Sequence, residues 1–142
     1  MRSERGSVLA LLPAAVMIVI VLGAIAVDGS LTFLAERQVA NLAASVANDA
    51  ATQGLDVVQY YEHGTLTLDE SLVQAVADDA AAAAVASLSH LDDLVIEVDV
   101  IDASTVAVSV TARTRTLFSR AMPASVEWRS VGATARAVAQ RG

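Results

Sequence analysis

The sequence predicts an α+β protein built on one long N-terminal helix, followed by a second helix and a small antiparallel three-stranded sheet. Three observations predict this fold. An uncharged apolar run occupies residues 8–27, helical spacing of apolar residues then continues to about Gln53, and from Leu94 the spacing changes to a period of two. The chain has 142 residues, so about 115 remain beyond the apolar run, which is enough for one compact head.

The apolar run at residues 8–27 has the length and composition of a transmembrane helix. At about 1.5 Å per residue, 20 residues span roughly 30 Å, which is the thickness of the hydrocarbon core of a bilayer. Twelve of the residues are Leu, Ile or Val, and together they favour insertion by about 4–7 kcal/mol. The alternative is a buried helix of a soluble protein, which so long an uncharged run disfavours in so small a domain.

Charges on either side of the run predict its orientation. Residues 1–7 form a short basic leader with Arg2 and Arg5, and only Arg37 lies close after the run. The positive-inside rule then keeps residues 1–7 in the cytoplasm and places the rest of the chain outside. Arg5 and Gly6 mark the inner membrane edge, and Asp28 marks the outer edge because a carboxylate is costly at the centre of a bilayer.

A cleaved signal peptide is the main alternative to an anchor. Ala24-Ile25-Ala26 has the small-x-small pattern of a cleavage site. Against cleavage, the apolar run is longer than the usual 7–15 residues, and the helical pattern continues through the proposed cut. We therefore favour an uncleaved anchor, while a secreted or periplasmic binding module stays open.

Beyond the span, residues 28–54 are predicted to continue the helix outside the membrane. Apolar residues recur at spacings of three and four and form one stripe rich in alanine. Such a stripe suits close packing, either against helices of partner proteins or against the protein's own head. The candidate contact residues are Ala35, Val39, Leu42, Ala43 and Val46. Gly54 is a plausible C′ residue that ends the helix.

Residues 55–142 are predicted to form an extracytoplasmic head. Residues 54–64 are expected to be a loop that holds Tyr60, Tyr61 and His63. Thr67 at the N-cap and Glu70 at N3 match a capping box, so a second helix should begin there and end near residues 89–91.

Alternation predicts a β-hairpin after this helix. Pairing Val100 with Val106, and so on along both strands, puts the apolar residues together, makes a three-residue turn and sets Asp93 opposite Arg113. Residues 117–123 should be a loop with Phe118 and Met122. A third strand then carries Val126 and Trp128 on one parity and Val131 on the other, which predicts a bulge near Arg129-Ser130.

The distribution of charge is uneven. Net charge is −7 and lysine is absent. Residues 28–102 hold 14 carboxylates and one arginine, whereas residues 103–142 hold six arginines and one carboxylate. We expect the acidic helices and basic strands to pair within one fold, and attraction between subunits is the alternative. The acidic balance and few aromatics disfavour nucleic acid as a partner.

Catalytic chemistry is not expected. The chain has no cysteine, which excludes disulfides and thiolate metal sites. His63 and His90 are far apart in sequence, and the adjacent carboxylate pairs at residues 78–79 and 92–93 cannot face each other. No phosphate loop or nucleophile motif is present. We therefore expect no enzyme, cofactor, metal or small-molecule substrate.

The first 55 residues resemble the TadE/TadG-like proteins of tight-adherence (Flp) pilus systems, most closely the TadG-like members. The matching pieces are Arg5-Gly6-Ser7, Pro13, Ala24-Ile25-Ala26-Val27-Asp28, Leu34-Ala35-Glu36-Arg37-Gln38 and the Ala/Asn-rich segment at residues 40–51. The strand at residues 131–137 also resembles one that closes many such proteins. The resemblance implies a pilin-like shape, a membrane-anchored role in pilus assembly or a related secretion apparatus, and partners that are pilin-like or pilus-assembly proteins.

One position departs from the family of processed pilins. Prepilin cleavage after Gly6 calls for Glu five residues on, where this chain has Leu11. The departure favours an unprocessed, membrane-resident assembly factor over a regular filament subunit. A single-pass structural or sensor protein unrelated to pili is a further alternative.

Overall fold

A computed structural model of the chain describes residues 5–118 and 128–140, with side chains from residue 11. In chain order its elements are α1 (Arg5–Gln53), α2 (Val57–His63), α3 (Glu70–Ser87), β1 (Leu91–Asp102), β2 (Thr105–Arg115) and β3 (Trp128–Val138). The prediction of an α+β fold with one long N-terminal helix and a three-stranded antiparallel sheet is confirmed.

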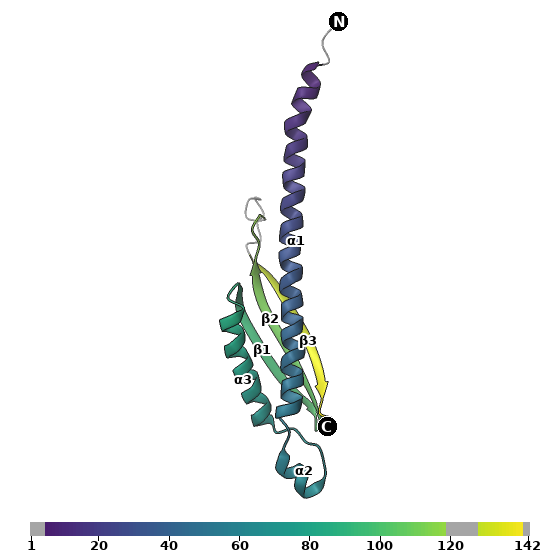
Figure 1. Cartoon of the computed structure of the whole chain (residues 1–142), viewed down its shortest axis with the longest axis vertical. Coiled ribbons are helices and arrows are strands. Elements are labelled where there is room, and N and C mark those ends of the chain that lie inside the picture. The colour runs from purple at the N-terminus through teal and green to yellow at the C-terminus, as the bar shows by residue number, and fades with distance from the viewer. Residues whose placement is uncertain (1–4, 119–127, 141–142) are drawn as a thin grey trace.

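Helix α1 is a single helix of 49 residues, roughly 74 Å long. Its N-terminal half projects away from the rest of the molecule, and its C-terminal half lies against the sheet (Figure 1). The helix does not break at Asp28-Gly29-Ser30. There Ser30 Oγ and Thr32 Oγ1 each donate a hydrogen bond to a carbonyl one turn back, on Ala26 and Asp28, so the polar side chains are satisfied within the helix.

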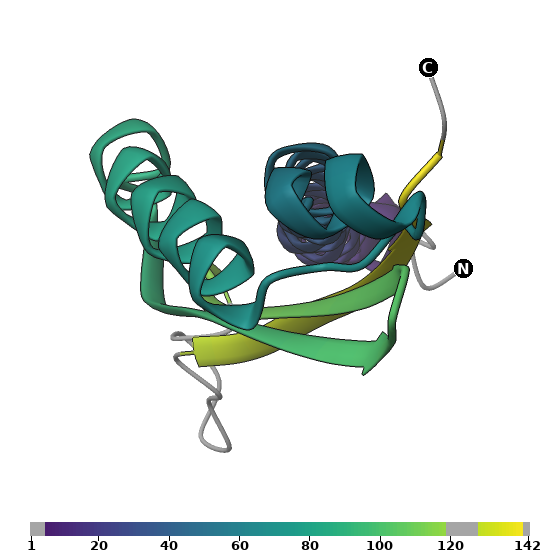
Figure 2. The ribbon, with the colours of Figure 1, turned by 90° about the horizontal axis from the view of Figure 1, so that it is seen from below.

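The head has two layers. The sheet has the order β1-β2-β3; α1 packs across β2 and β3, and α3 covers β1 and contacts α1. Seen from below, both helices lie on one face of the sheet (Figure 2). No element that the structure describes covers the opposite face.

The hairpin register is confirmed. Ile96 pairs with Val110, and the pairs along the strands continue to Val100 and Val106. The turn is one residue shorter than predicted, because Asp102 pairs with Thr105.

A bulge shifts the start of β1. It lies between Asp92 and Val95, so that Asp92, and not Asp93, stands opposite Arg113. Asp93 has a φ of 50°, a left-handed conformation that Asp tolerates better than most residues. Its carboxylate nevertheless reaches Arg113, with Oδ2 at 2.9 Å from Nη1.

The third strand is regular, and the predicted bulge near Arg129-Ser130 is wrong. Pairing with β2 continues without a shift from Trp128 opposite Arg115 to Val138 opposite Thr105. Trp128 lies on the open face of the sheet, where the Arg115 guanidinium carbon is 4.5 Å from its ring centroid. Because Trp128 does not belong to the core, no change of parity is needed before the buried Val131. Val126 and Met122 lie outside the described residues.

The core lies between α1 and the inner face of the sheet. Alanines and valines of α1 are buried against valines of β2, and Val73 of α3 closes one side. Small side chains on α1 let the helix approach the strands closely, which gives the dense packing typical of protein interiors. The helix continues beyond residue 28 to Gln53, and this C-terminal half of α1 is the centre of the head.

The segment that connects α1 to α3 differs from the predicted loop. Residues 57–63 form the short helix α2, because the Asp56 side chain accepts a hydrogen bond from the Gln59 backbone N–H and Gly64, at φ 68°, caps its C-terminus. Tyr60 and Tyr61 pack edge to face on this helix, with centroids 5.8 Å apart.

The start and end of α3 also correct the prediction. Asp69 is the N-cap and accepts from the backbone N–H groups of Ser71 and Leu72. The hydroxyl of Thr67, the predicted cap, is buried without a hydrogen-bond partner. The helix ends at Ser87, a little before the predicted region.

Gly54 follows the last residue of α1, as predicted, but for a different reason. Its φ is not positive, so it is not a left-handed cap. A Cβ at Gly54 would overlap the side chain of Val73 and lie 2.5 Å from the carbonyl oxygen of Ala50. Glycine is needed because α1 and α3 approach each other closely here.

Candidate membrane and partner surfaces

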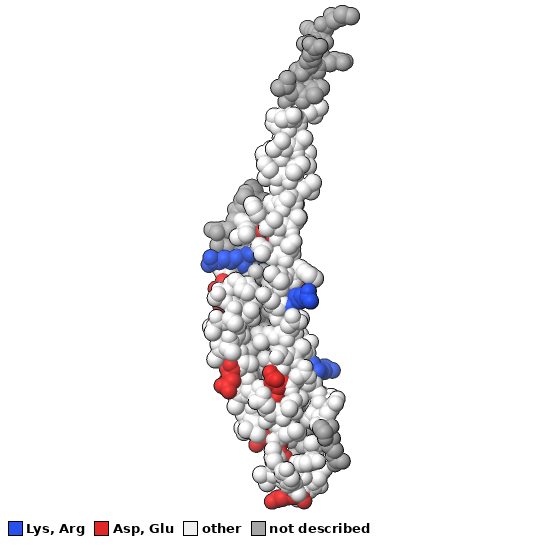
Figure 3. Space-filling model, in the orientation of Figure 1, with Lys and Arg blue, Asp and Glu red and all other residues white. Residues whose placement is uncertain are grey.

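The N-terminal half of α1 is an exposed apolar rod. Its large apolar side chains at residues 11–27 are 42–68% exposed. Among the described residues, α1 is the one helix long and apolar enough to cross a membrane, by length and composition alone, and none of its most apolar window is buried. The rod is free of charge over the part that Figure 3 shows in white, and the charged side chains begin at the head.

The predicted contact stripe lies inside the protein. Four of its five residues are buried in the head's own core: Ala35, Val39, Ala43 and Val46. Of the two alternatives for this stripe, contact with the head is the one that the structure shows. A partner helix cannot reach these side chains because the sheet already covers them.

Leu42 is the exception, because it is only partly buried. It lines an open groove of about 470 Å³ between α1 and α3. Ser45 of α1 and Ala83 of α3 also line this groove, and both are exposed. The groove is the part of the predicted contact region that stays accessible.

Asp28 has a role that the sequence did not reveal. Its carboxylate accepts hydrogen bonds from the backbone N–H groups that follow β2. Leu117 N lies 2.8 Å from Oδ1, and Phe118 N lies 3.1 Å from Oδ1 and 3.2 Å from Oδ2. Asp28 thus ties the end of β2 to α1 across 89 residues of sequence. No periodic pattern could have found this contact, because it joins a helix interior to the end of a strand.

Apolar surface surrounds this contact. Beyond Asp28, α1 carries the exposed side chains of Phe33 and Leu34, and the β2 end adds Leu117 and Phe118. Phe33 is 66% exposed and Phe118 is 47% exposed. The next charged residue of α1 after Asp28 is Glu36. The apolar character of the surface therefore continues past the predicted membrane edge.

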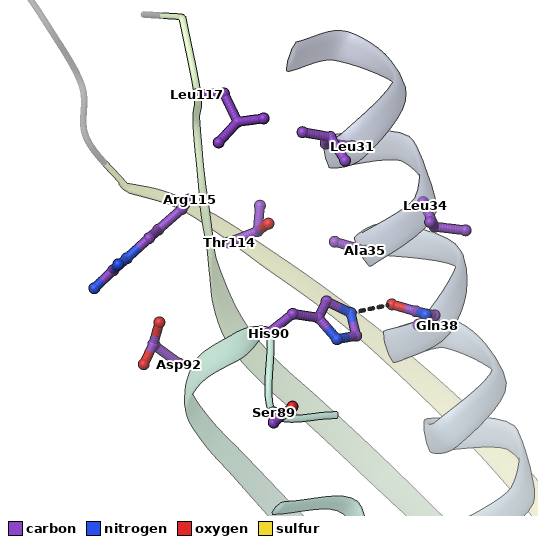
Figure 4. Close-up of a pocket in the computed structure, with 10 residues that line it drawn as sticks. All are labelled: Leu31, Leu34, Ala35, Gln38, Ser89, His90, Asp92, Thr114, Arg115 and Leu117. Carbon is purple, nitrogen blue, oxygen red and sulfur yellow. Dashed lines mark hydrogen bonds between the residues drawn. The ribbon is translucent and has the colours of Figure 1, made fainter. Parts of the chain in front are cut away.

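A cleft of about 440 Å³ opens between α1 and the ends of β1 and β2. Its side nearest the span is apolar, with Leu31, Leu34 and Leu117 (Figure 4). Its other side is polar: His90 Nε2 lies 2.7 Å from Gln38 Oε1, which fastens the start of β1 to α1. The lining of the cleft therefore changes from apolar to polar along the direction of α1.

The two ends of the head differ in charge: one holds arginines together with Glu36, Asp92 and Asp93, and the other holds carboxylates. Four of its five described arginines lie near the β2 end that Asp28 holds: Arg37, Arg113, Arg115 and Arg129. Carboxylates gather at the opposite end, around α2 and the β1–β2 turn: Asp56, Glu62, Asp69, Glu70 and Asp102. Among the residues that the structure describes, Asp93 and Arg113 form an ion pair, and this pair joins two strands, not a helix and a strand.

Two of these carboxylates have lowered pKa values for structural reasons. The Ser71 hydroxyl and then the backbone N–H groups of Ser71 and Leu72 lower the pKa of Asp69. The backbone N–H of Ser104 and the hydroxyl of Thr105 lower that of Asp102. Both groups serve a helix cap or a turn.

Within residues 5–118 and 128–140, no three His, Asp or Glu side chains lie together in a way that could hold a metal ion. His63 ends α2 and His90 is paired with Gln38, so the structure does not bring the two histidines into one site. Arg5 and Gly6, the predicted inner edge, lie in the first turn of α1, and the rest of the leader falls outside the described residues.

Comparisons of the chain with family models, with curated proteins and with solved structures found no match.

Proposed function

We propose that this chain is a single-pass membrane protein with its N-terminus in the cytoplasm and its α+β head outside. In this proposal it acts through protein–protein contacts as a pilin-like component of tight-adherence (Flp) pilus assembly or a related secretion apparatus. One observation carries the proposal. A single 49-residue helix has an unpacked apolar N-terminal half and a C-terminal half that forms the core of a small head.

The apolar half supports anchoring. A soluble protein rarely leaves so large a contiguous apolar surface in water, and each Leu, Ile or Val of the rod favours the bilayer by about 0.3–0.6 kcal/mol. The division of α1 between an anchor and a head core is the arrangement that the TadE/TadG-like resemblance implies.

The groove between α1 and α3 supports a contact function. It is open between α1 and α3, and small side chains such as Ser45 and Ala83 line it. Small residues allow the backbone of another helix to approach closely, as in membrane helix pairs. Leu42 gives the groove an apolar contact that a partner helix could cover.

Site-specific crosslinking in the native cell tests this proposal. A photoreactive residue at Ser45 should capture a second single-span pilin-like protein. The same residue at Glu97, which is exposed on the open face of the sheet, serves as the matched control. Ile20→Asp, which places a carboxylate in the rod, should abolish both membrane fractionation and the Ser45 crosslink.

Two results would contradict the proposal. A mature protein that is soluble and begins at Val27 would identify a secreted or periplasmic binding module with a cleaved signal. A membrane-bound protein whose Ser45 position never captures a pilin-like partner would indicate a structural or sensor protein unrelated to pili.

A further inference from the structure

We infer that the end of the head nearest the span is seated in the headgroup region of the membrane that α1 crosses. The water boundary then lies near Glu36 and not at Asp28. The inference rests on the anchoring part of the proposed function and adds a second membrane contact, made by the head. We call this contact surface the apolar collar; it consists of Phe33, Leu34, Leu117, Phe118 and Trp128.

Asp28 need not lie in water, because its carboxylate is hydrogen-bonded within the protein. An unpaired carboxylate is expensive in an apolar medium, whereas one that accepts charge-assisted bonds from backbone N–H groups is much less so. Asp28 accepts from both Leu117 N and Phe118 N. The same bonds satisfy two backbone donors at the end of β2, which would otherwise need water. The contact is therefore compatible with a site at the membrane interface.

The length of α1 between Asp28 and Glu36 gives the depth to which this end of the head enters the membrane. Eight residues separate Asp28 from Glu36, which corresponds to roughly 12 Å of helix. The headgroup regions together add about 10–15 Å to the hydrocarbon core, so this segment extends through one headgroup region and a little way into the hydrocarbon. The large exposed side chains over that length, Phe33 and Leu34, are apolar, and the exposed Ser30 hydroxyl is hydrogen-bonded to the carbonyl oxygen of Ala26.

The strand end contributes aromatic residues at the same level. Leu117 and Phe118 are held beside Asp28, and Trp128 lies opposite Arg115, two residues before Leu117. Tryptophan is enriched at membrane–water interfaces, where its ring sits at headgroup level. The guanidinium of Arg115 stacks on that ring and can extend to lipid phosphates while its stem stays in the apolar layer.

The charges near the collar are mixed, because Glu36, Asp92 and Asp93 lie among the arginines there. The far end of the head, around α2, carries carboxylates, which anionic lipid surfaces repel. The collar is also continuous with the apolar rod, because no described charged residue other than Asp28 lies on α1 between Leu11 and Glu36. A lipid surface is therefore the occupant that this end of the head fits.

Trp128 makes the inference directly measurable, because it is the only tryptophan in the sequence. The full chain is reconstituted at a low protein-to-lipid ratio in vesicles of phosphatidylcholine and phosphatidylglycerol whose acyl chains are brominated near the headgroup. We expect Trp128 emission to be lower than in unbrominated vesicles, because a tryptophan ring at the interface lies at headgroup level. Bromine at the chain ends should quench it less.

Two control proteins separate this inference from the anchor itself. Both carry Trp128→Phe. The first adds Ile20→Trp in the rod, which should be quenched most strongly by bromine at the chain ends. The second adds Tyr61→Trp on α2, where the native side chain is 82% exposed at the far end of the head, and it should not be quenched.

The outcomes are distinct. If Ile20→Trp is quenched and Trp128 is not, the seating of the head is wrong and the anchor stands. If Ile20→Trp is not quenched either, the anchor fails and the inference fails with it. If Trp128 resists bromine but its emission shifts to the blue as the protein-to-lipid ratio rises, another protein copy covers the collar and the inference is overturned.

A variant at the collar adds a second measurement. Phe118→Ser keeps the backbone N–H that bonds to Asp28 and removes one apolar side chain. It should reduce the quenching of Trp128 and leave that of the Ile20→Trp protein unchanged. Unaltered quenching of Trp128 would show that Phe118 does not contribute to the seat.

Discussion

Replacing Asp28 with alanine should release the end of β2 from α1 while the rest of the fold persists. The substitution removes the acceptor for both the Leu117 and the Phe118 backbone N–H groups, which lie 2.8 and 3.1 Å from Oδ1. These bonds link α1 to the segment directly after β2. The core between α1 and the sheet contains neither Asp28 nor Leu117, so it should stay intact.

The magnitude follows from the strength of charge-assisted hydrogen bonds. Such a bond contributes about 1.5–3 kcal/mol when its partners are shielded from water. Both donors are on exposed residues, so solvent or headgroup oxygens can replace part of the lost acceptor. We expect the free energy of local opening at Leu117 and Phe118 to fall by about 1–2 kcal/mol. Backbone amide exchange there should become roughly 5- to 30-fold faster.

Hydrogen exchange measured by mass spectrometry on the full chain in nanodiscs checks this prediction. Asp28→Asn is the matched control, because its amide oxygen keeps one acceptor and its effect should be smaller. Glu36→Ala removes an exposed carboxylate from the same helix and should change nothing at Leu117 or Phe118. If Asp28→Ala leaves their exchange at the wild-type rate while β2 remains protected, the Asp28 contact does not hold the strand end and this reasoning is refuted.

Three further predictions concern the stability of the head. Gly54→Ala should destabilise it by about 1–3 kcal/mol in denaturant unfolding, because the new Cβ would overlap Val73 and approach the carbonyl oxygen of Ala50. Arg113→Ala should change the free energy of unfolding by less than about 1 kcal/mol, since its ion pair with Asp93 is exposed. The head should also lose stability as pH falls below about 4. Hydrogen bonds hold the pKa of Asp69 below its ordinary value. The stabilisation that ionised Asp69 gives the folded state is therefore present above the pKa that Asp69 has in the unfolded chain, and it disappears as pH falls through the pKa of Asp69 in the folded protein.

Each of these predictions has a control in the same chain. Gly29→Ala is the counterpart of Gly54→Ala, because a Cβ at Gly29 meets nothing within 4 Å; equal destabilisation by both would exclude the steric explanation. The effect of Arg113→Ala should vanish in 1 M salt, because the Debye length there is only about 3 Å and exposed charges are screened. A loss of stability that does not depend on salt would indicate packing instead. Asp69→Asn retains a good N-cap without a titrating group, so an unchanged acid transition would remove Asp69 as a cause.

Patterns that are local in the sequence predicted much of the fold. The hairpin register followed from matching apolar residues on two strands, because a slip by one residue would turn valines toward Glu97 and Asp99. The extent of α1 followed from unbroken apolar periodicity. The existence of α3 was also predicted, but its N-cap was not, because Thr67 and Asp69 are both good caps and only the packed chain fixes which one is used.

Features that depend on contacts distant in sequence were missed. The change of parity between Trp128 and Val131 predicted a bulge, whereas β3 is regular and Trp128 lies on the open face over Arg115. The alanine stripe of α1 was compatible with a partner helix or with the head, and burial of Val39 and Val46 under the sheet decides for the head. The pairing of Asp28 with Leu117 joins residues that no repeat or motif connects.

The sequence by itself determined that this protein has one apolar rod, one long helix and a small sheet, because each of these follows from the spacing of residues along a short segment. The tertiary structure alone decided which face of α1 is available to a partner and where the surface changes from apolar to polar. Both depend on which side chains the sheet covers and on which backbone N–H groups reach Asp28. Burial and hydrogen-bond satisfaction are properties of segments brought together by folding, so the position of Asp28 in the sequence did not specify its surroundings.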